Sequence, residues 1–277
     1  MDVFAHGGRT VAPHDLLDAW NLDPILLVAI AATALIYRRG LSRSSRPRAL
    51  RAWCFAGALI AITLALVSPL EAMSGALASA HMVQHVLLLL VAAPMLVVGA
   101  PLRTIVRGMP LIARRWFARC RHALPPVARW RLPGDPVVLW LLHAGTIWFW
   151  HAAVPYGAAL ESEAIHVAEH ASFMVTGVLF WRLVIHAQKT ANNGLPVLLV
   201  FAMGVQSVFL SALLTFAPQP WYEPYTETTR VWGLDPLDDQ QLAGVVMWVP
   251  AGAIYVGAAL ALLLAWLRSV DRQALMD

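Results

Sequence analysis

Two pairs of histidines in this sequence have a spacing that would let each pair bind a metal ion. His81 and His85 lie four residues apart, and so do His166 and His170. On a helix, this separation places both imidazoles of a pair on one face, about 6 Å apart along the axis. Glu169 adds a carboxylate between the second pair. Imidazole and carboxylate groups suit copper or zinc, and we expect copper, with zinc as the alternative.

Three further residues are candidate ligands for the same metal ion. His151 ends one apolar segment, and Asp239 and Met247 lie near the start of the last one. Taken singly, Asp239 also fits a helix start, where a carboxylate stabilises the positive end of the helix dipole, and Met247 also fits ordinary packing. The two cysteines, Cys54 and Cys120, lie away from these residues. An iron–sulfur cluster or a thiolate-rich zinc site is therefore not expected.

The composition indicates that a lipid bilayer surrounds most of the chain. Of the 277 residues, 59% are hydrophobic and 13% are charged, whereas globular domains carry about 25% charged residues. So little polar surface excludes a cytosolic enzyme, a nucleic-acid-binding protein and a disordered chain. The 12 tryptophans fit the membrane interface, where an amphipathic ring is stable.

Seven apolar segments predict an all-α, polytopic membrane protein with a seven-transmembrane-helix bundle. We treat residues 1–277 as a single integral membrane domain, since no soluble domain fits between the segments. The first, second and fourth segments are short for a span of about 20 residues. The segments cover residues 24–37, 52–67, 80–98, 136–151, 164–186, 195–216 and 243–267.

The basic residues predict the orientation of the bundle. All but two of the 20 Lys and Arg residues fall on one side of the seven segments, and these residues favour the cytoplasmic side. The N terminus is then outside and the C terminus inside, with residues 1–21 as an extracytoplasmic tail. Residues 99–135 form a basic cytoplasmic loop, which we expect to contact anionic lipid of the bilayer, with no nucleic acid as a partner. Both histidine pairs lie near the extracytoplasmic surface in this topology.

The order and spacing of four short motifs resemble the CtaG family of cytochrome c oxidase (caa3-type) assembly factors. The motifs are HMVQH at residues 81–85, APMLVVGAP at 93–101, HVAEH at 166–170 and DQQLAG at 239–244. The resemblance implies a multi-pass protein of the bacterial cytoplasmic (inner) membrane. It further implies a metallochaperone or assembly factor, not an enzyme, that helps copper reach the catalytic subunit of a haem–copper oxidase. A periplasmic copper donor would supply the metal.

Two other functions fit part of the same pattern. His166-x-x-Glu169-His170 fits the H-x-x-E-H motif of zinc peptidases, in which the glutamate acts as a general base, and would make the chain an intramembrane zinc-dependent hydrolase. The histidines could instead be axial ligands of a b-type haem, or part of a quinone site. We prefer the assembly factor, because the peptidase motif is short and because haem binding would leave one histidine of each pair without a clear role.

Overall fold

The computed structural model describes residues 11–44, 49–99, 101–123, 135–187 and 194–274, and within these ranges the chain is helical, without a strand. Six helices or continuous helical runs are long and apolar enough to cross a membrane. Each overlaps a predicted segment, so the all-α membrane fold is confirmed. They are α1 (Pro24–Ser42), α2 (Ala49–Leu66), the run of α4 (Ala78–Val86), η2 (Leu87–Ala92) and α5 (Ala93–Gly99), α10 (Glu163–Ala187), α11 (Leu195–Thr215) and α13 (Pro236–Ala274).

The fourth predicted segment is a helix that bends sharply at its end. α8 (Pro136–His151) is followed by α9 (Ala153–Glu161) at an angle of 71°, and together they could form a seventh span. Pro155 explains the break, because proline has no N–H with which to bond the His151 carbonyl four residues earlier. That carbonyl instead accepts a hydrogen bond from the Tyr222 hydroxyl at 3.0 Å. The bend therefore fixes His151 at the end of α8.

A π-helix, η2, interrupts the span that carries the first histidine pair. Ala93 N donates to the Leu88 carbonyl, five residues earlier, as in a π-helix. The next residue in this pattern is Pro94, which has no N–H. The Leu89 carbonyl, five residues earlier, therefore has no backbone donor at Pro94. Trp181 Nε1 donates to the Leu89 carbonyl at 2.8 Å. Since Trp181 belongs to α10, this hydrogen bond ties the first histidine-bearing span to the second.

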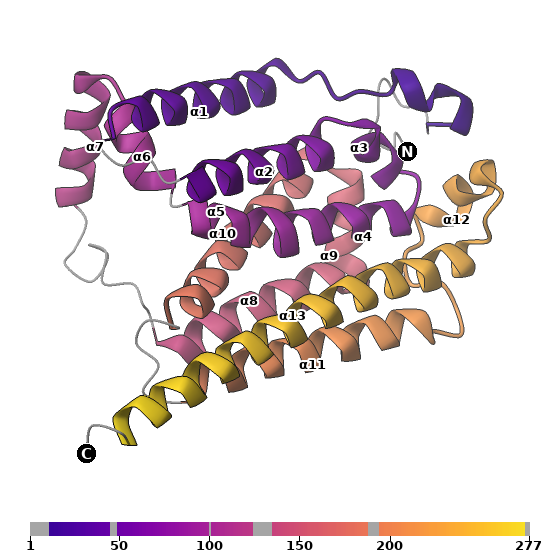
Figure 1. Ribbon diagram of the computed structural model, residues 1–277. Helices are drawn as coiled ribbons and strands as arrows, with labels where there is room; N and C mark the ends of the chain where they lie inside the picture. The colour runs from indigo at the N-terminus through magenta and orange to yellow at the C-terminus, as the bar shows by residue number, and fades with distance from the viewer. Residues whose placement is uncertain (1–10, 45–48, 100, 124–134, 188–193, 275–277) are drawn as a thin grey trace.

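Glycines allow the closest approaches between helices. α11 and α13 run side by side along one flank of the bundle (Figure 1), and a Cβ at Gly244 in α13 would lie only 2.3 Å from Thr215 Oγ1. At the opposite flank, a Cβ at Gly40 in α1 would lie 1.9 Å from the Thr104 carbonyl oxygen. The run of α4, η2 and α5 lies between these flanks and is the most enclosed of the spans.

Short elements cover the end of the bundle at which α4 begins (Figure 1). Val11 and Ala19 pack against Ala72 and Trp232, and Trp232 Nε1 donates to the Val11 carbonyl at 3.0 Å. The described part of the predicted N-terminal tail therefore packs against the bundle. The covering elements are η1 (Pro13–Asp18), α3 (Pro69–Ser74), α12 (Tyr225–Thr228) and η3 (Thr229–Trp232).

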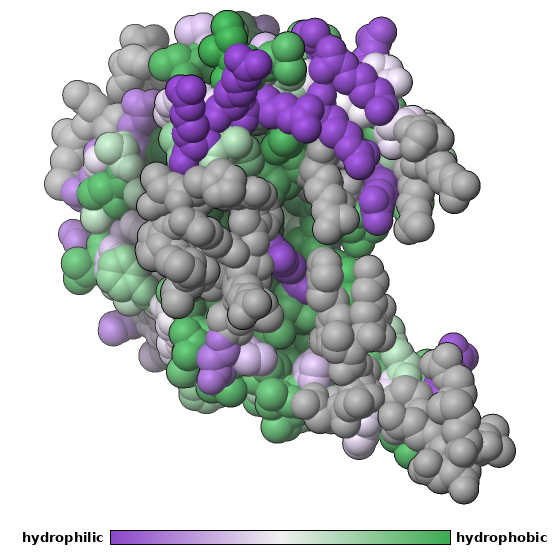
Figure 2. Space-filling model, turned by 90° about the vertical axis from the view of Figure 1, so that its left-hand side faces the viewer, coloured by the Kyte–Doolittle hydropathy of each residue, from purple (hydrophilic) through white to green (hydrophobic). Residues whose placement is uncertain are grey.

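Basic residues gather at the other end of the bundle, where α6 (Pro101–Gly108) and α7 (Leu111–Ala123) lie beside the end of α1. Figure 2 looks onto this end and shows hydrophilic residues along its upper part. Residues 124–134 of the predicted basic loop lie outside the described residues. This separation agrees with the predicted sidedness, although the side of the membrane that each end faces stays a prediction. The exposed arginines here are Arg38, Arg39, Arg43, Arg107, Arg114, Arg115 and Arg119.

Candidate metal centre

Four of the predicted ligands form a compact, buried cluster between two spans. α4 contributes His81 and His85, and α10 contributes Glu169 and His170. One possible ligand atom from each residue lies within 4.8 Å of the other three. His81 and Glu169 are fully buried, and the exposed fractions of His85 and His170 are 3% and 8%. We call these four residues the His–Glu cluster.

Asp239 lies outside the His–Glu cluster and holds the start of α4. The residue before α4, Leu77, has no side chain that could cap the helix. The Asp239 carboxylate, from α13, instead accepts hydrogen bonds from Ala78 N at 2.6 Å and from the backbone N–H and hydroxyl of Ser79. A carboxylate at this position satisfies free N–H groups and favours the positive end of the helix dipole. Asp239 thereby fixes the turn of α4 on which His81 lies.

Tyr225 sets the tautomer of the neutral His81 ring. Its hydroxyl donates to the Ser74 carbonyl at 2.6 Å and lies 3.2 Å from His81 Nδ1. A hydroxyl has one hydrogen, and the carbonyl can only accept, so the Tyr225 oxygen accepts a hydrogen bond from His81 Nδ1–H. The other nitrogen of the neutral ring, His81 Nε2, therefore has a free lone pair.

The free lone pair of His81 faces a carboxylate. His81 Nε2 lies 3.5 Å from Glu169 Oε2, and His85 Nε2 lies 3.4 Å from Glu169 Oε1. Among the residues that the structure describes, neither carboxylate oxygen makes a hydrogen bond, and neither does His81 Nε2 or His170 Nε2. Two acceptors that face each other in a buried site repel unless a cation or a proton lies between them. The His–Glu cluster therefore has the geometry and the charge to hold a positive ion.

His166 lies at the rim of the His–Glu cluster rather than inside it. Its ring centroid is 4.2 Å from that of His170 and 5.2 Å from that of His81, but it falls outside the set of ligand atoms that converge. His166 Nδ1 is 3.7 Å from Glu71 Oε1, and both side chains are partly exposed, at 17% and 22%. Burial raises the pKa of Glu71 to about 7, although a hydrogen bond from Gln84 opposes the shift. The pair is the partly exposed edge of an otherwise buried site.

His151 and Met247 lie beside His85 but outside the His–Glu cluster. The His151 ring centroid is 5.6 Å from that of His85, and both residues line a small cavity together with Met247. His151 Nδ1 lies 2.7 Å from the Ile147 carbonyl, which can only accept, so Nδ1 carries the hydrogen and Nε2 has the lone pair. Within the described chain, His151 Nε2 makes no hydrogen bond.

Several residues that support the cluster were not predicted from the sequence. Tyr156 and Tyr222 stack at 3.8 Å beside His81, and the Tyr156 hydroxyl lies 3.3 Å from that of Tyr225. Gln84 donates to the Ala65 carbonyl and to Glu71. Of these residues, only Gln84 could be recognised in the sequence, because it is a polar residue within an apolar span. Tyr156 lies in α9, and Tyr222 and Tyr225 lie in the connection between α11 and α13. Nothing local in the sequence indicates their role.

Comparison with known proteins gave one match. The family model described as "Cytochrome c oxidase caa3 assembly factor (Caa3_CtaG)" matches residues 30–269. This range contains the whole His–Glu cluster, together with His151, His166, Asp239 and Met247. No curated protein and no solved structure matches the chain.

Proposed function

The chain belongs to the cytochrome c oxidase caa3 assembly factor family, and we propose that it binds copper in the His–Glu cluster and helps to deliver it to the catalytic subunit of the oxidase. In this proposal the protein lies in the bacterial cytoplasmic membrane, with the cluster near the extracytoplasmic surface. A periplasmic copper donor supplies the ion through the rim formed by Glu71 and His166. The protein acts as a metallochaperone without catalysing a reaction.

One observation carries this proposal: His81 Nε2 lies 3.5 Å from the buried carboxylate of Glu169, and neither group makes a hydrogen bond to a residue in the described ranges. A buried carboxylate without a hydrogen-bond donor is costly, and a bound cation removes that cost. Three neutral imidazoles and one carboxylate carry a net charge of −1. A cuprous ion would make the site neutral, whereas a divalent ion would leave a buried positive charge. This charge balance favours copper in its monovalent state.

The distances within the cluster also support a metal ion. Four ligands at about 2.0–2.1 Å from a tetrahedral ion lie roughly 3.4 Å from one another. His81 Nε2 lies 3.5 Å from Glu169 Oε2, His85 Nε2 lies 3.4 Å from Glu169 Oε1, and one ligand atom from each of the four residues lies within 4.8 Å of the other three. Imidazole and carboxylate ligands without thiolate are compatible with copper and with zinc. Metal identity must therefore be measured.

The arrangement gives less support to the two alternatives. In a zinc hydrolase of the H-x-x-E-H type, His166 and His170 would both bind the metal and Glu169 would stay free as the base. Here Glu169 belongs to the converging set and His166 does not. For haem, the five ring contacts among His81, His85, His166 and His170 have centroid distances of 4.2–5.9 Å. This packing leaves no gap of porphyrin size within the site.

A complementation experiment tests the proposal in cells. A strain that lacks the protein would be complemented with the parent, with Glu169→Gln, or with the His81→Ala/His85→Ala double variant. Both variants should insert in the membrane and leave the oxidase polypeptides present, but oxidase copper content and oxygen consumption should fall. His143→Gln is the matched control, because His143 is a buried histidine that lies 3.1 Å from Thr176 Oγ1, outside the cluster. Full oxidase copper content with both cluster variants would contradict the proposal.

A further inference from the structure

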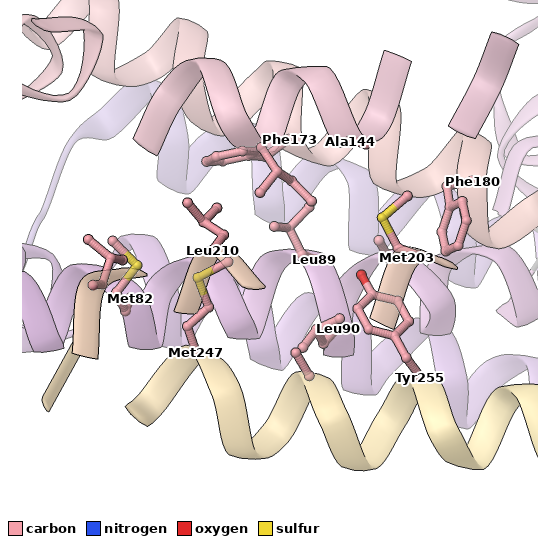
Figure 3. Packing of buried hydrophobic residues seen from close by; sticks show 14 of the residues in the cluster. Met82, Leu89, Leu90, Ala144, Phe173, Phe180, Met203, Leu210, Met247 and Tyr255 are labelled. Carbon is pink, nitrogen blue, oxygen red and sulfur yellow. The ribbon is translucent and has the colours of Figure 1, made fainter. Parts of the chain in front are cut away.

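A cavity of about 30 Å³ lies beside the His–Glu cluster, on the side of α4 that faces α13. One water molecule needs about 10–15 Å³ by the same measure, so the cavity can hold a small ion. Met82 of α4 and Met247 of α13 line the cavity, and Figure 3 shows both among the buried hydrophobic residues. Besides these two residues, His85 and His151 line the cavity.

The cavity combines two thioethers with the unused nitrogen of His151, and His85 lines both the cavity and the His–Glu cluster. His151 Nε2 and His85 Nδ1 are buried and make no hydrogen bond to any residue in the described ranges. Met82 is fully buried, and Met247 is 9% exposed. Most of the remaining wall is apolar, with Ser207 and Tyr255 as its other polar residues. Water is stable in a cavity when it has two to four polar partners, and the region around the methionines offers few.

This set of donors differs chemically from the His–Glu cluster. Thioethers are soft ligands that bind cuprous ion in preference to harder cations. The cavity wall contains no carboxylate, so a divalent ion would bring two uncompensated charges into a buried site, and a monovalent ion brings one. The cavity is therefore suited to a soft monovalent cation, whereas the His–Glu cluster also accepts zinc.

We propose that Met82, Met247 and His151 form a second metal site, selective for cuprous ion, that receives the ion from the His–Glu cluster past His85, whose neutral ring has one lone pair and binds one ion at a time. This inference rests on the proposed function, because the cluster supplies the ion. His85 links the two sites: its Nε2 lies 3.4 Å from Glu169 Oε1, and its ring centroid is 5.6 Å from those of both His170 and His151. The ion keeps its charge during the transfer, so no oxidant or reductant is needed.

The order of the sites follows from their contacts. Glu71 and His166 at the rim are partly exposed, the His166 ring contacts those of His81 and His170 in the cluster, and His85 lines both the cluster and the cavity. A cation that enters at the rim meets oxygen and imidazole ligands first and thioethers last. This order lets the cavity retain cuprous ion while zinc stays in the cluster.

Metal stoichiometry tests the second site directly. The full chain, purified without a histidine tag and placed in lipid nanodiscs, would be titrated with Ag⁺, a soft monovalent ion that does not change its oxidation state, and separately with Zn²⁺. The parent should bind two Ag⁺ and one Zn²⁺. The Met82→Leu/Met247→Leu double variant should bind one of each, and the retained Zn²⁺ shows that it is folded. Met203→Leu is the matched control, since Met203 is fully buried in the same core but does not line the cavity.

X-ray absorption at the silver edge of the parent gives a test without any variant. Sulfur neighbours should be detected in the parent with two Ag⁺ bound. The second site is refuted if the parent binds one Ag⁺, if the methionine double variant still binds two, or if the silver spectrum contains no sulfur neighbour. Failure of the proposed function would look different, because the parent would then bind neither Zn²⁺ nor Ag⁺.

Discussion

Removing the Tyr225 hydroxyl should weaken metal binding without removing a ligand. Tyr225→Phe deletes the group that accepts a hydrogen bond from His81 Nδ1 and donates to the Ser74 carbonyl. The His81 ring then loses the contact that fixes its orientation and keeps Nε2 unprotonated. The variant keeps the aromatic ring, so the packing around Tyr156 should change little.

The size of the effect follows from the lost hydrogen bonds to Ser74 and His81, and the Tyr156 hydroxyl, 3.3 Å away, loses a partner as well. Loss of a partner that orients a metal-bound histidine costs about 10–100-fold in affinity, or about 1.4–2.7 kcal/mol. The Ser74 carbonyl and His81 Nδ1 are also left buried without a partner, which costs about 1–3 kcal/mol of folding stability for such groups. Copper affinity would be measured by competition with a chromophoric chelator, and stability by unfolding in detergent.

Tyr37→Phe provides the matched control for this prediction. Tyr37 is also buried, and its hydroxyl lies 3.2 and 3.3 Å from the Arg51 and Gly99 carbonyls at the other end of the bundle. Both variants should lose stability, but only Tyr225→Phe should lose copper affinity. Equal affinity in the parent and in both variants would show that the Tyr225 contact does not position His81 for a metal ion.

Three further predictions follow from other parts of the structure. Asp239→Ala should destabilise the fold by about 0.5–2 kcal/mol through loss of the α4 cap, and it should weaken metal binding. Asp238→Ala, at an exposed position, should change neither stability nor metal affinity in the same unfolding and chelator assays. Gly244→Ala should lower the midpoint of thermal unfolding, because its Cβ would lie 2.3 Å from Thr215 Oγ1. A Cβ at Gly145 would meet no described atom within 4 Å, so Gly145→Ala should leave the midpoint unchanged. A reporter fused to the C terminus should be active only if it works in the cytoplasm, and activity of a periplasmic reporter at that site would refute the orientation.

The apolar spans and the histidine pairs could be predicted because both depend on local spacing. Hydropathy located six spans, five of them to within five residues, whereas the last begins seven residues earlier than predicted. The four-residue spacing placed His81 beside His85 on one face of α4. The same spacing could not distinguish His166 from His170. Only His170 converges with α4, because this depends on how far α10 is shifted along its neighbour, and that shift is set by packing over the whole span.

Contacts between distant segments could not be predicted from the sequence. Asp239 caps a helix that begins about 160 residues earlier in the chain, and Tyr225 reaches His81 from a connection between spans. Pro155 does carry a local signal for the bend after His151, but its direction depends on contacts with other helices. The cavity beside His85 exists only once α4, α8, α11 and α13 are packed together.

The central claim is that the His–Glu cluster holds a copper ion through Glu169. Its most direct test is the copper content of the full chain, purified without a tag after cuprous loading in nanodiscs under reducing conditions, for the parent and for Glu169→Gln. X-ray absorption would be recorded on the copper-loaded protein. The bound copper of the parent should include nitrogen and oxygen neighbours, and the variant should bind one equivalent fewer while remaining folded. A parent that binds no copper, or a Glu169→Gln variant that binds as much copper as the parent, would contradict a copper site at Glu169.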